Sequence, residues 1–294
     1  MPSSSFKTWI LASRPHTLPA AAAPVIIGTA MATEVGGFHL LSCLSALAGA
    51  LLIQIATNFA NDYYDFKKGA DEGERLGPTR ATQAGLINPH SMRTAMILTF
   101  TLAIIIGVYL VWRGGWPIVI IGLSSVLFGV MYTGGPYPLG YNGLGELFVL
   151  IYFGPVAVGG TYYVQTLDIN SVVLIAGLSP GLFSVAILTI NNLRDISNDL
   201  RTGKRTLAVR FGKTFARYEY LLTLKIATLV PLGLWFVTGQ HALAIISMAT
   251  FIVAIQPSMK VFTFKDGYEL NKVLETTGKL LLLYSLLFSV GWLL

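Results

Sequence analysis

The sequence predicts an all-α integral membrane protein in which about nine transmembrane helices form a bundle. Three observations support this fold class. The chain of 294 residues is 54% hydrophobic and only 12% charged, whereas a soluble domain carries about 25% charged residues. Its mean hydropathy is +0.66. Long apolar runs without charges alternate with polar connections along the whole chain. A soluble globular fold is therefore excluded.

Nine apolar stretches approach the length of about 20 residues that a helix needs to cross the bilayer core. Most connections are short and contain glycine, but the polar segments 61–91 and 191–217 are long and follow the second and sixth stretches. We expect one transmembrane domain over residues 1–294, with two related four-helix halves and a ninth helix appended. The predicted spans are 17–33, 39–60, 92–112, 116–133, 145–165, 171–190, 218–238, 241–262 and 276–294.

The positions of Lys and Arg predict the orientation of the chain, because cytoplasmic loops are enriched in positive charge. With the N-terminus in the cytoplasm, all of the 20 Lys and Arg residues except Arg113 fall on the cytoplasmic side. The C-terminus is then expected outside. We expect a bacterial inner membrane, although a plastid membrane fits the same topology. The N-terminal sequence does not predict a cleavable signal peptide, and the single Cys43 excludes a disulfide framework.

Two polar clusters close apolar runs and share one spacing. Each places an Asn and two Asp residues on one helix face, with the first Asp four residues after the Asn. The clusters are Asn58, Asp62 and Asp65 after the second stretch, and Asn191, Asp195 and Asp199 after the sixth. Carboxylates are costly near hydrocarbon and usually mark function there. Oxygen ligands suit Mg²⁺, with Mn²⁺ as an alternative, and Mg²⁺ is usually held by a few carboxylates together with substrate phosphate. The pattern predicts a metal site for a phosphorylated ligand in a cytoplasm-facing cavity.

Basic residues flank both clusters and could bind the phosphate groups of such a ligand. Arg grips phosphate through two hydrogen bonds, and Lys acts as a point charge. The same charges also satisfy the positive-inside rule, so contact with lipid headgroups stays an alternative for each of them. The predicted diphosphate-binding residues are Lys67, Lys68, Arg80, Arg201, Lys204 and Arg205.

The segment from Asn61-Asp62-Tyr-Tyr-Asp65 to Asp71 resembles the first aspartate-rich motif of the UbiA-type membrane prenyltransferases, and Asp195-x-x-x-Asp199 resembles the second. Other segments resemble one branch of that family, the 1,4-dihydroxy-2-naphthoate polyprenyltransferases of menaquinone and phylloquinone biosynthesis. They are Arg14-Pro-His-Thr-Leu-Pro19, Gly77-Pro-Thr-Arg80, Tyr141-Asn-Gly-Leu-Gly-Glu146, Phe153-Gly-Pro155 and the run from Asn191 to Arg210. The resemblance extends from Arg14 to about Lys213.

The resemblance implies a nine-helix bundle whose cavity opens to the cytoplasm and whose bound prenyl tail leaves sideways into lipid. It implies transfer of a polyprenyl group from polyprenyl diphosphate to 1,4-dihydroxy-2-naphthoate. The prenyl group replaces the carboxylate, so that diphosphate and CO₂ are released and a demethylmenaquinol-type product forms. The role of Asp71 stays open. The residues that the resemblance assigns to Mg²⁺ and catalysis are Asn58, Asp62, Asp65, Asp195 and Asp199.

This reaction needs an allylic cation that is protected from water. An apolar membrane cavity excludes water, and aromatic rings stabilise cations by cation–π contact. Tyr132 and Tyr141 lie at a suitable predicted depth, and Glu146 could orient the acceptor. We therefore include these three residues in the predicted acceptor site.

Two other functions remain open at this point. A UbiA-type enzyme could prenylate another aromatic acceptor, such as 4-hydroxybenzoate or homogentisate. A transporter of a phosphorylated ligand would also have repeated halves and membrane-embedded acids, although the acids here end their spans instead of occupying the midplane. We expect the bilayer, polyprenyl diphosphate and the naphthoate as partners, and no nucleic acid.

Overall fold

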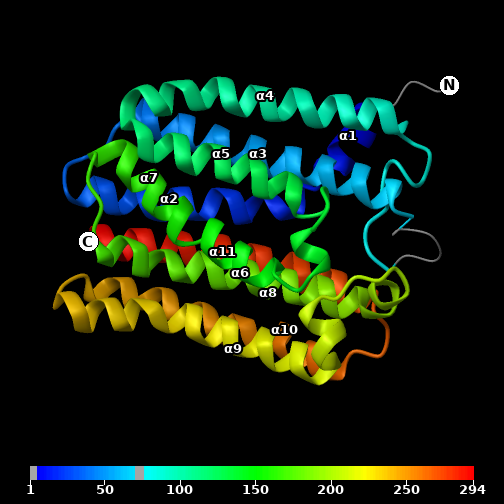
Figure 1. Cartoon of the computed structure of the whole chain (residues 1–294). Coiled ribbons are helices and arrows are strands. Elements are labelled where there is room, and N and C mark those ends of the chain that lie inside the picture. The colour runs from blue at the N-terminus through cyan, green and yellow to red at the C-terminus, as the bar shows by residue number, and fades with distance from the viewer. Residues whose placement is uncertain (1–4, 70–75) are drawn as a thin grey trace.

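The computed structural model describes residues 5–69 and 76–294, and these residues form helices without a β-strand (Figure 1). Asp71 of the first motif lies outside the described residues. The helices are α1 Phe6–Ser13, η1 Pro15–Thr17, α2 Leu18–Glu34, α3 Leu40–Lys67, α4 Pro89–Gly114, α5 Trp116–Met131, η2 Leu139–Tyr141, α6 Gly145–Tyr152, α7 Pro155–Thr166, α8 Ser171–Arg201, α9 Leu207–Thr238, η3 Ala242–Ala249, α10 Thr250–Thr263 and α11 Glu269–Leu293.

Seven helical segments of the described chain are long and apolar enough to cross a membrane. Two of these segments join consecutive helices, α6 with α7 and η3 with α10. The shorter helices α2 and α5, with 17 and 16 residues, match the first and fourth predicted spans. The prediction of an all-α membrane protein with about nine spans is therefore confirmed.

The fifth predicted span is interrupted at Gly154, whose φ of −112° and ψ of −113° end α6 before α7 begins. The reason is close packing. A Cβ atom on Gly154 would lie 2.7 Å from the carbonyl oxygen of Gly177 on α8, and one on Gly181 would lie 2.5 Å from the carbonyl oxygen of Leu150. Small residues allow helix backbones to approach closely in membranes. The break therefore seats α6 and α7 against the Gly-x-x-x-Gly segment of α8.

Two helices begin earlier than their hydropathy predicts. α9 starts at Leu207 although the apolar span is predicted from residue 218, because the side chain of Thr206 accepts a hydrogen bond from the N–H of Val209 and caps the helix. The chain bends within α9 at Gly212, where φ is +86°. α11 likewise starts at Glu269 instead of residue 276. Both helices therefore have additional turns, residues 207–217 and 269–275, before their apolar spans begin.

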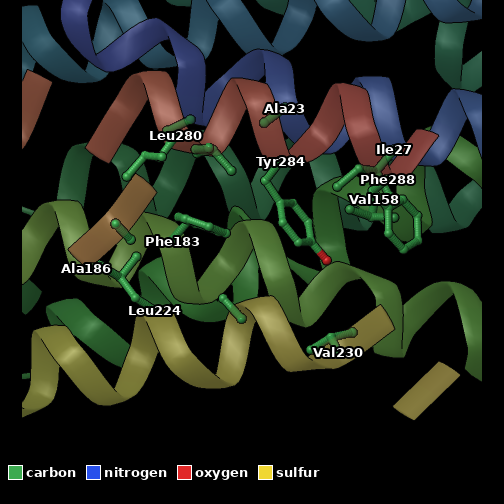
Figure 2. Close-up of a cluster of buried hydrophobic side chains, with 14 of the residues drawn as sticks. Ala23, Ile27, Val158, Phe183, Ala186, Leu224, Val230, Leu280, Tyr284 and Phe288 are labelled. Carbon is green, nitrogen blue, oxygen red and sulfur yellow. The ribbon is translucent and has the colours of Figure 1, made fainter. Parts of the chain in front are cut away.

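The main core lies where α2, α7, α8, α9 and α11 meet, and Figure 2 shows buried side chains from these helices facing one another. The hydroxyl of Tyr284 on α11 donates to Ser179 Oγ on α8 at 2.7 Å, and Ser179 donates to the carbonyl of Ala227 on α9 at 2.9 Å. In lipid, packing and such interhelical hydrogen bonds hold helices together. The ninth predicted span, which is α11, is thus central to the fold.

The two predicted halves pair their helices in the same way. In the first half α3 packs most extensively on α4, and in the second half α8 packs most extensively on α9. The C-terminal ends of α3 and α8, which carry the two motifs, lie at the same end of the bundle (Figure 1). The fold therefore brings the two polar clusters to one place.

Candidate active site

Lys204 joins the two motifs. Its Nζ atom lies 3.6 Å from Oδ1 of Asp65 on α3 and 3.8 Å from Oδ1 of Asp199 on α8. Gly203, with a φ of +75°, turns the chain directly after α8 and places Lys204 over the site. The last acids of both motifs are buried, and a shared cation offsets their mutual repulsion.

Asp65 contacts side chains from two other segments of the chain. It accepts hydrogen bonds from Arg80 Nη2 at 2.7 Å and from the hydroxyl of Tyr141 at 2.8 Å. The Nζ atoms of Lys68 and Lys204 lie 4.3 and 4.7 Å from the centre of the Tyr141 ring, a cation–π distance. Tyr141 therefore contacts both the acid and two of the cations beside it.

Asp195 is paired with the residue that precedes it. Arg194 donates from Nε and Nη2 to the two oxygens of Asp195 at 2.8 and 2.7 Å. The same guanidinium donates to Asn191 on α8 and to Asn271 on α11 at 2.7 and 2.8 Å. A Cβ atom on Gly77 would lie 2.6 Å from Arg194 Nη2. Arg194 therefore ties α8, α11 and the loop after α3 together.

Asn58 and Asp62 contact neighbouring segments of the chain. Asn58 Nδ2 donates to two oxygens in the segment 13–17, at 2.9 and 3.0 Å. The oxygens of Asp62 accept from the backbone N–H groups of Ala81 and Thr82 at 3.0 and 3.1 Å. The two hydrogen bonds of Asp62 fix the loop that carries Arg80. Asp62 does not line the cavity beside it.

A polar cavity of about 220 Å³ lies between the two motifs. The sequence-predicted residues that line it are Asn58, Asp65, Arg80, Tyr132, Tyr141, Asp195, Asp199 and Lys204. Asn191 of the second cluster lines it as well, and further polar lining residues are Arg14, His16, Asn61, Asn192, Arg194 and Asn198. Arg14 and His16 belong to a segment of the family resemblance, and Arg194 stands beside Asp195, so those three had a signal in the sequence. Asn192 belongs to the run from Asn191 to Arg210 that carries the resemblance, but its contact with Glu146 on α6 left no sign in the sequence.

Four predicted diphosphate-binding residues do not line this cavity. Lys68 is close to it, because its Nζ atom donates to the carbonyl oxygen of Thr133 at 2.6 Å. Lys67, Arg201 and Arg205 are exposed on the surface of the same end of the bundle. Their side chains match the alternative interpretation, contact with lipid headgroups, better than a buried phosphate site.

A second, apolar cavity of about 400 Å³ continues from the polar one and lies between α2, α3, α4, α5, α6 and α7. Phe128, Phe148 and Tyr152 form an aromatic cluster in its wall, with ring centres 4.7 to 6.3 Å apart. The residues that line both cavities, and so mark their junction, are Ala20, Gln54, Thr57, Tyr132, Val149 and Phe153. A ligand with a charged head and a long apolar tail fits this arrangement.

Two of the three predicted acceptor residues line the cavities. Tyr132 stands at the junction, and Tyr141 lines the polar cavity. Glu146 lies behind the wall, where its Oε1 accepts a hydrogen bond from Asn192 Nδ2 at 2.9 Å. Asn192 itself lines the polar cavity. Glu146 therefore acts on the cavity through Asn192.

Burial, with smaller contributions from nearby charges, lowers two pKa values at the site outside the membrane spans. Burial lowers the pKa of His16, and the charges of Arg14 and Arg194 lower it further, so that this imidazole is neutral at pH 7. Burial also lowers the pKa of Lys68, and nearby Lys204 adds to this effect while Asp65 opposes it.

The donor atoms of the cavity fit a hard cation such as Mg²⁺, because they are carboxylate and amide oxygens without a cysteine. Asp65, Asp195 and Asp199 offer carboxylates there. Among the described residues, no group of three or more His, Cys, Asp and Glu side chains is close enough to hold a metal alone. A metal in this cavity would therefore share its coordination with phosphate oxygens or water, as Mg²⁺ commonly does.

Comparisons with known proteins agree with the fold and the motifs. The model of the UbiA prenyltransferase family matches residues 21–287. The chain is 37% identical to the 1,4-dihydroxy-2-naphthoate octaprenyltransferase of Escherichia coli, over 98% of this chain and 96% of that protein. It is 36% identical to the protein of the same name from Mycobacterium tuberculosis, over 96% of each chain.

A solved structure has the same fold at low sequence identity. A UbiA homologue from Archaeoglobus fulgidus, bound to GPP and Mg²⁺, superposes with a TM-score of 0.66 over 97% of this chain and 99% of that one, at 14% identity. The family match covers most of the chain, and two relatives exceed 30% identity over nearly its full length. The chain therefore belongs to the UbiA prenyltransferase family.

Proposed function

We propose that the protein transfers a polyprenyl group from polyprenyl diphosphate to 1,4-dihydroxy-2-naphthoate in a Mg²⁺-dependent reaction, with release of diphosphate and CO₂. The observation that carries this proposal is the junction of two cavities. A polar cavity with facing carboxylates and cations continues into an apolar cavity inside the membrane bundle. The names of the E. coli and M. tuberculosis relatives support the same donor and acceptor classes.

The diphosphate head of the donor is placed in the polar cavity. Arg80 and Lys204 line it and present charged donors, and Lys68 lies beside them over the Tyr141 ring. Arg can bind phosphate through two parallel hydrogen bonds, and Lys supplies a mobile point charge. As the bond between the allylic carbon and the diphosphate breaks, these cations stabilise the negative charge that develops on the leaving group.

Asp65, Asp195 and Asp199 are the residues that would hold Mg²⁺, since their carboxylates line the same cavity. Bound Mg²⁺ would neutralise charge on the diphosphate oxygens. The solved UbiA homologue with GPP and Mg²⁺ supports this choice of metal. Asp62, which the motif also assigns to the metal, accepts hydrogen bonds from the backbone of the loop that bears Arg80. Mn²⁺ is the alternative metal.

The apolar cavity protects the reacting carbon. Its lining is almost entirely aliphatic and aromatic, so water is excluded from the allylic cation that would otherwise be hydrolysed. Tyr132 stands at the junction of the cavities, where an aromatic face can stabilise positive charge. The tail is placed among the aliphatic residues beyond it.

The acceptor is placed at the wall formed by Tyr141 and Asn192. Asn192 is held by Glu146 through the hydrogen bond described above, so its amide has a fixed direction. An electron-rich ring carbon of the naphthoate attacks the allylic carbon. Loss of the carboxylate from that ring carbon as CO₂ restores the aromatic ring, and no added base is required.

The proposed orientation follows from charge. The C-terminal ends of α3 and α8, which carry the motifs, lie at one end of the bundle (Figure 1). The long basic segments that follow both motifs in the sequence begin at this end, which the positive-inside rule assigns to the cytoplasm. The N-terminus is then cytoplasmic and the C-terminus outside. The E. coli and M. tuberculosis relatives are bacterial proteins, which supports a bacterial inner membrane as the location.

A membrane assay with labelled polyprenyl diphosphate tests the proposal. We expect prenylated naphthoquinol and an equal amount of CO₂ with 1,4-dihydroxy-2-naphthoate and Mg²⁺, and neither product in EDTA. Product with 4-hydroxybenzoate or homogentisate instead would keep the chemistry and replace the acceptor. Absence of transfer to every acceptor would contradict the proposed function.

A further inference from the structure

The carboxylates of the polar cavity are matched by basic side chains that line the same cavity. Among the residues that the structure describes, four positive and three negative groups line it, which gives a formal charge of +1. They are Arg14, Arg80, Arg194 and Lys204, and Asp65, Asp195 and Asp199. A metal ion that enters alone therefore meets acids whose charge is already compensated, and nearby positive charge opposes its binding.

Two of these cations are held tightly by the acids they pair with. The side chain of Arg194 is 1% exposed and donates to both oxygens of Asp195 at 2.8 and 2.7 Å. Arg80 is 8% exposed and donates to Asp65 Oδ2 at 2.7 Å. These are direct, charge-assisted hydrogen bonds at buried positions. The two guanidinium groups are therefore fixed parts of the site.

Lys204 is held differently. Its Nζ atom lies 3.6 and 3.8 Å from Oδ1 of Asp65 and Asp199, beyond the range of about 2.7 to 3.2 Å for a direct hydrogen bond. Its backbone is anchored, because the N–H of Lys204 donates to the carbonyl oxygen of Asp199 at 2.8 Å. A lysine ammonium is a point charge on a flexible four-carbon stem. The ammonium can therefore leave the two acids while the backbone of Lys204 stays in place.

A metal ion that binds carboxylates of both motifs needs the region between Asp65 and Asp199, where Lys204 Nζ lies. The side chains of the two acids are only 1% and 6% exposed, so water screens the repulsion between a metal ion and this ammonium weakly. A bound diphosphate reverses the balance. Its oxygens attract the ammonium away from the acids and supply further ligands to Mg²⁺.

We propose that Lys204 makes metal binding depend on diphosphate. The ammonium keeps a free metal ion from the position between Asp65 and Asp199, and bound diphosphate draws the ammonium away from it. This inference rests on the proposed function. Mg²⁺ alone then binds weakly, and Mg²⁺ and diphosphate raise each other's affinity by the same factor. The two acids hold a metal ion firmly only when a donor is present.

Two dissociation constants of the purified protein in detergent test this dependence. The Kd of Mn²⁺ alone is measured by electron paramagnetic resonance, and the Kd of inorganic pyrophosphate in Mg²⁺ is measured by calorimetry. For Lys204→Met we expect Mn²⁺ alone to bind about fivefold more tightly, because a like charge is removed. Pyrophosphate should bind about fivefold more weakly, because a charged donor is lost. Damage to the site would weaken both.

Further variants keep the test independent of one substitution. Lys204→Gln is neutral and should change both constants in the same directions as Lys204→Met. Lys204→Arg keeps the charge and should leave the Kd of Mn²⁺ within about twofold of the wild type. Lys213→Met is the matched control, because Lys213 is exposed at the start of α9 and lines neither cavity. It should leave both constants unchanged.

A melting curve gives a second readout of metal binding. A ligand that binds the folded state raises Tm, so Mn²⁺ alone should raise Tm more in the two neutral variants than in the wild type. Unchanged or weaker binding of Mn²⁺ alone in both neutral variants would overturn the role of Lys204. These measurements need neither an acceptor nor turnover. Failure of the proposed function would instead appear as absence of prenyl transfer by the wild type.

Discussion

The first acids of the two motifs occupy matching sequence positions and have different partners. Asp62 on α3 accepts two backbone N–H groups of the following loop. Asp195 on α8 forms a two-point ion pair with Arg194, its neighbour in the chain. Asp62 therefore orders a loop, whereas Asp195 keeps its carboxylate at the cavity.

The last acids of the motifs, in contrast, share a partner. Asp65 and Asp199 come from different helices, yet both are within ion-pair distance of Lys204. The comparison teaches that a repeated spacing determines which helix face a carboxylate occupies. The side chains and backbone groups beside each acid, which differ between the two motifs, determine what that carboxylate contacts.

The largest expected effect is the loss of a shared acid. Asp65→Asn and Asp199→Asn each remove one of the two carboxylates beside Lys204, which we propose bind Mg²⁺, so we expect kcat/KM to fall about a hundredfold or more. The Mg²⁺ concentration for half-maximal rate should rise in both. Prenyl transfer in membranes measures these values.

Asp168→Asn is the control for this pair, because Asp168 is exposed in the loop between α7 and α8 and does not line either cavity. It should behave like the wild type. Near-normal turnover of Asp65→Asn or Asp199→Asn would remove the metal-site hypothesis.

Asp62→Asn sharpens the comparison between the two first acids. An amide NH₂ in place of one oxygen would face a backbone N–H, and an unmatched buried hydrogen bond costs about 1 to 3 kcal/mol. We expect a lower Tm and a lower rate, with an unchanged Mg²⁺ requirement. A raised Mg²⁺ requirement without a change in Tm would show that Asp62 is a direct ligand, as its motif predicts.

A smaller effect is expected at Tyr141. Tyr141→Phe removes the hydrogen bond to Asp65 and keeps the ring between the two lysines, so kcat/KM should fall about fivefold, corresponding to about 1 kcal/mol. Tyr141→Leu also removes the cation–π contacts and should cost more. Equal rates in the two variants would show that the ring contacts do not contribute.

The smallest effect concerns pH. The pKa of His16 is lowered in the folded protein, so below pH 6.5 the unfolded chain binds a proton that the folded chain does not. Stability is therefore lost as pH falls through that range and is unaffected above it. In detergent, the decrease in Tm between pH 7 and pH 5.5 should be smaller for His16→Gln than for the wild type. An identical decrease would contradict this role.

Composition and spacing predicted the fold well. Charge-free apolar runs define the spans, and the all-α membrane fold and the UbiA family are both confirmed. Hydropathy could not place the break at Gly154 or the early start of α9, because these depend on the backbone of α8 and on the cap at Thr206. Such contacts are tertiary and leave no periodic signal.

The candidate site was predicted less completely. The motif spacing identified the acids that line the cavity, but charge alone could not separate Lys204, which meets both motifs, from exposed Arg201 and Arg205. The positive φ of Gly203 turns the chain after α8 and places Lys204 over the site, which the charge pattern alone could not predict. Arg194 is similar, since its partner Asn271 on α11 is far away in the sequence.

The central claim is that Asp65 and Asp199 act on one bound diphosphate. A double-mutant cycle tests it most directly, with the Kd of pyrophosphate in Mg²⁺ measured by calorimetry for the wild type, Asp65→Asn, Asp199→Asn and the double variant. The account predicts a coupling energy of about 1 kcal/mol or more, because residues in one ion-pair network are not additive. Additive losses of binding, or unchanged binding in both single variants, would contradict it.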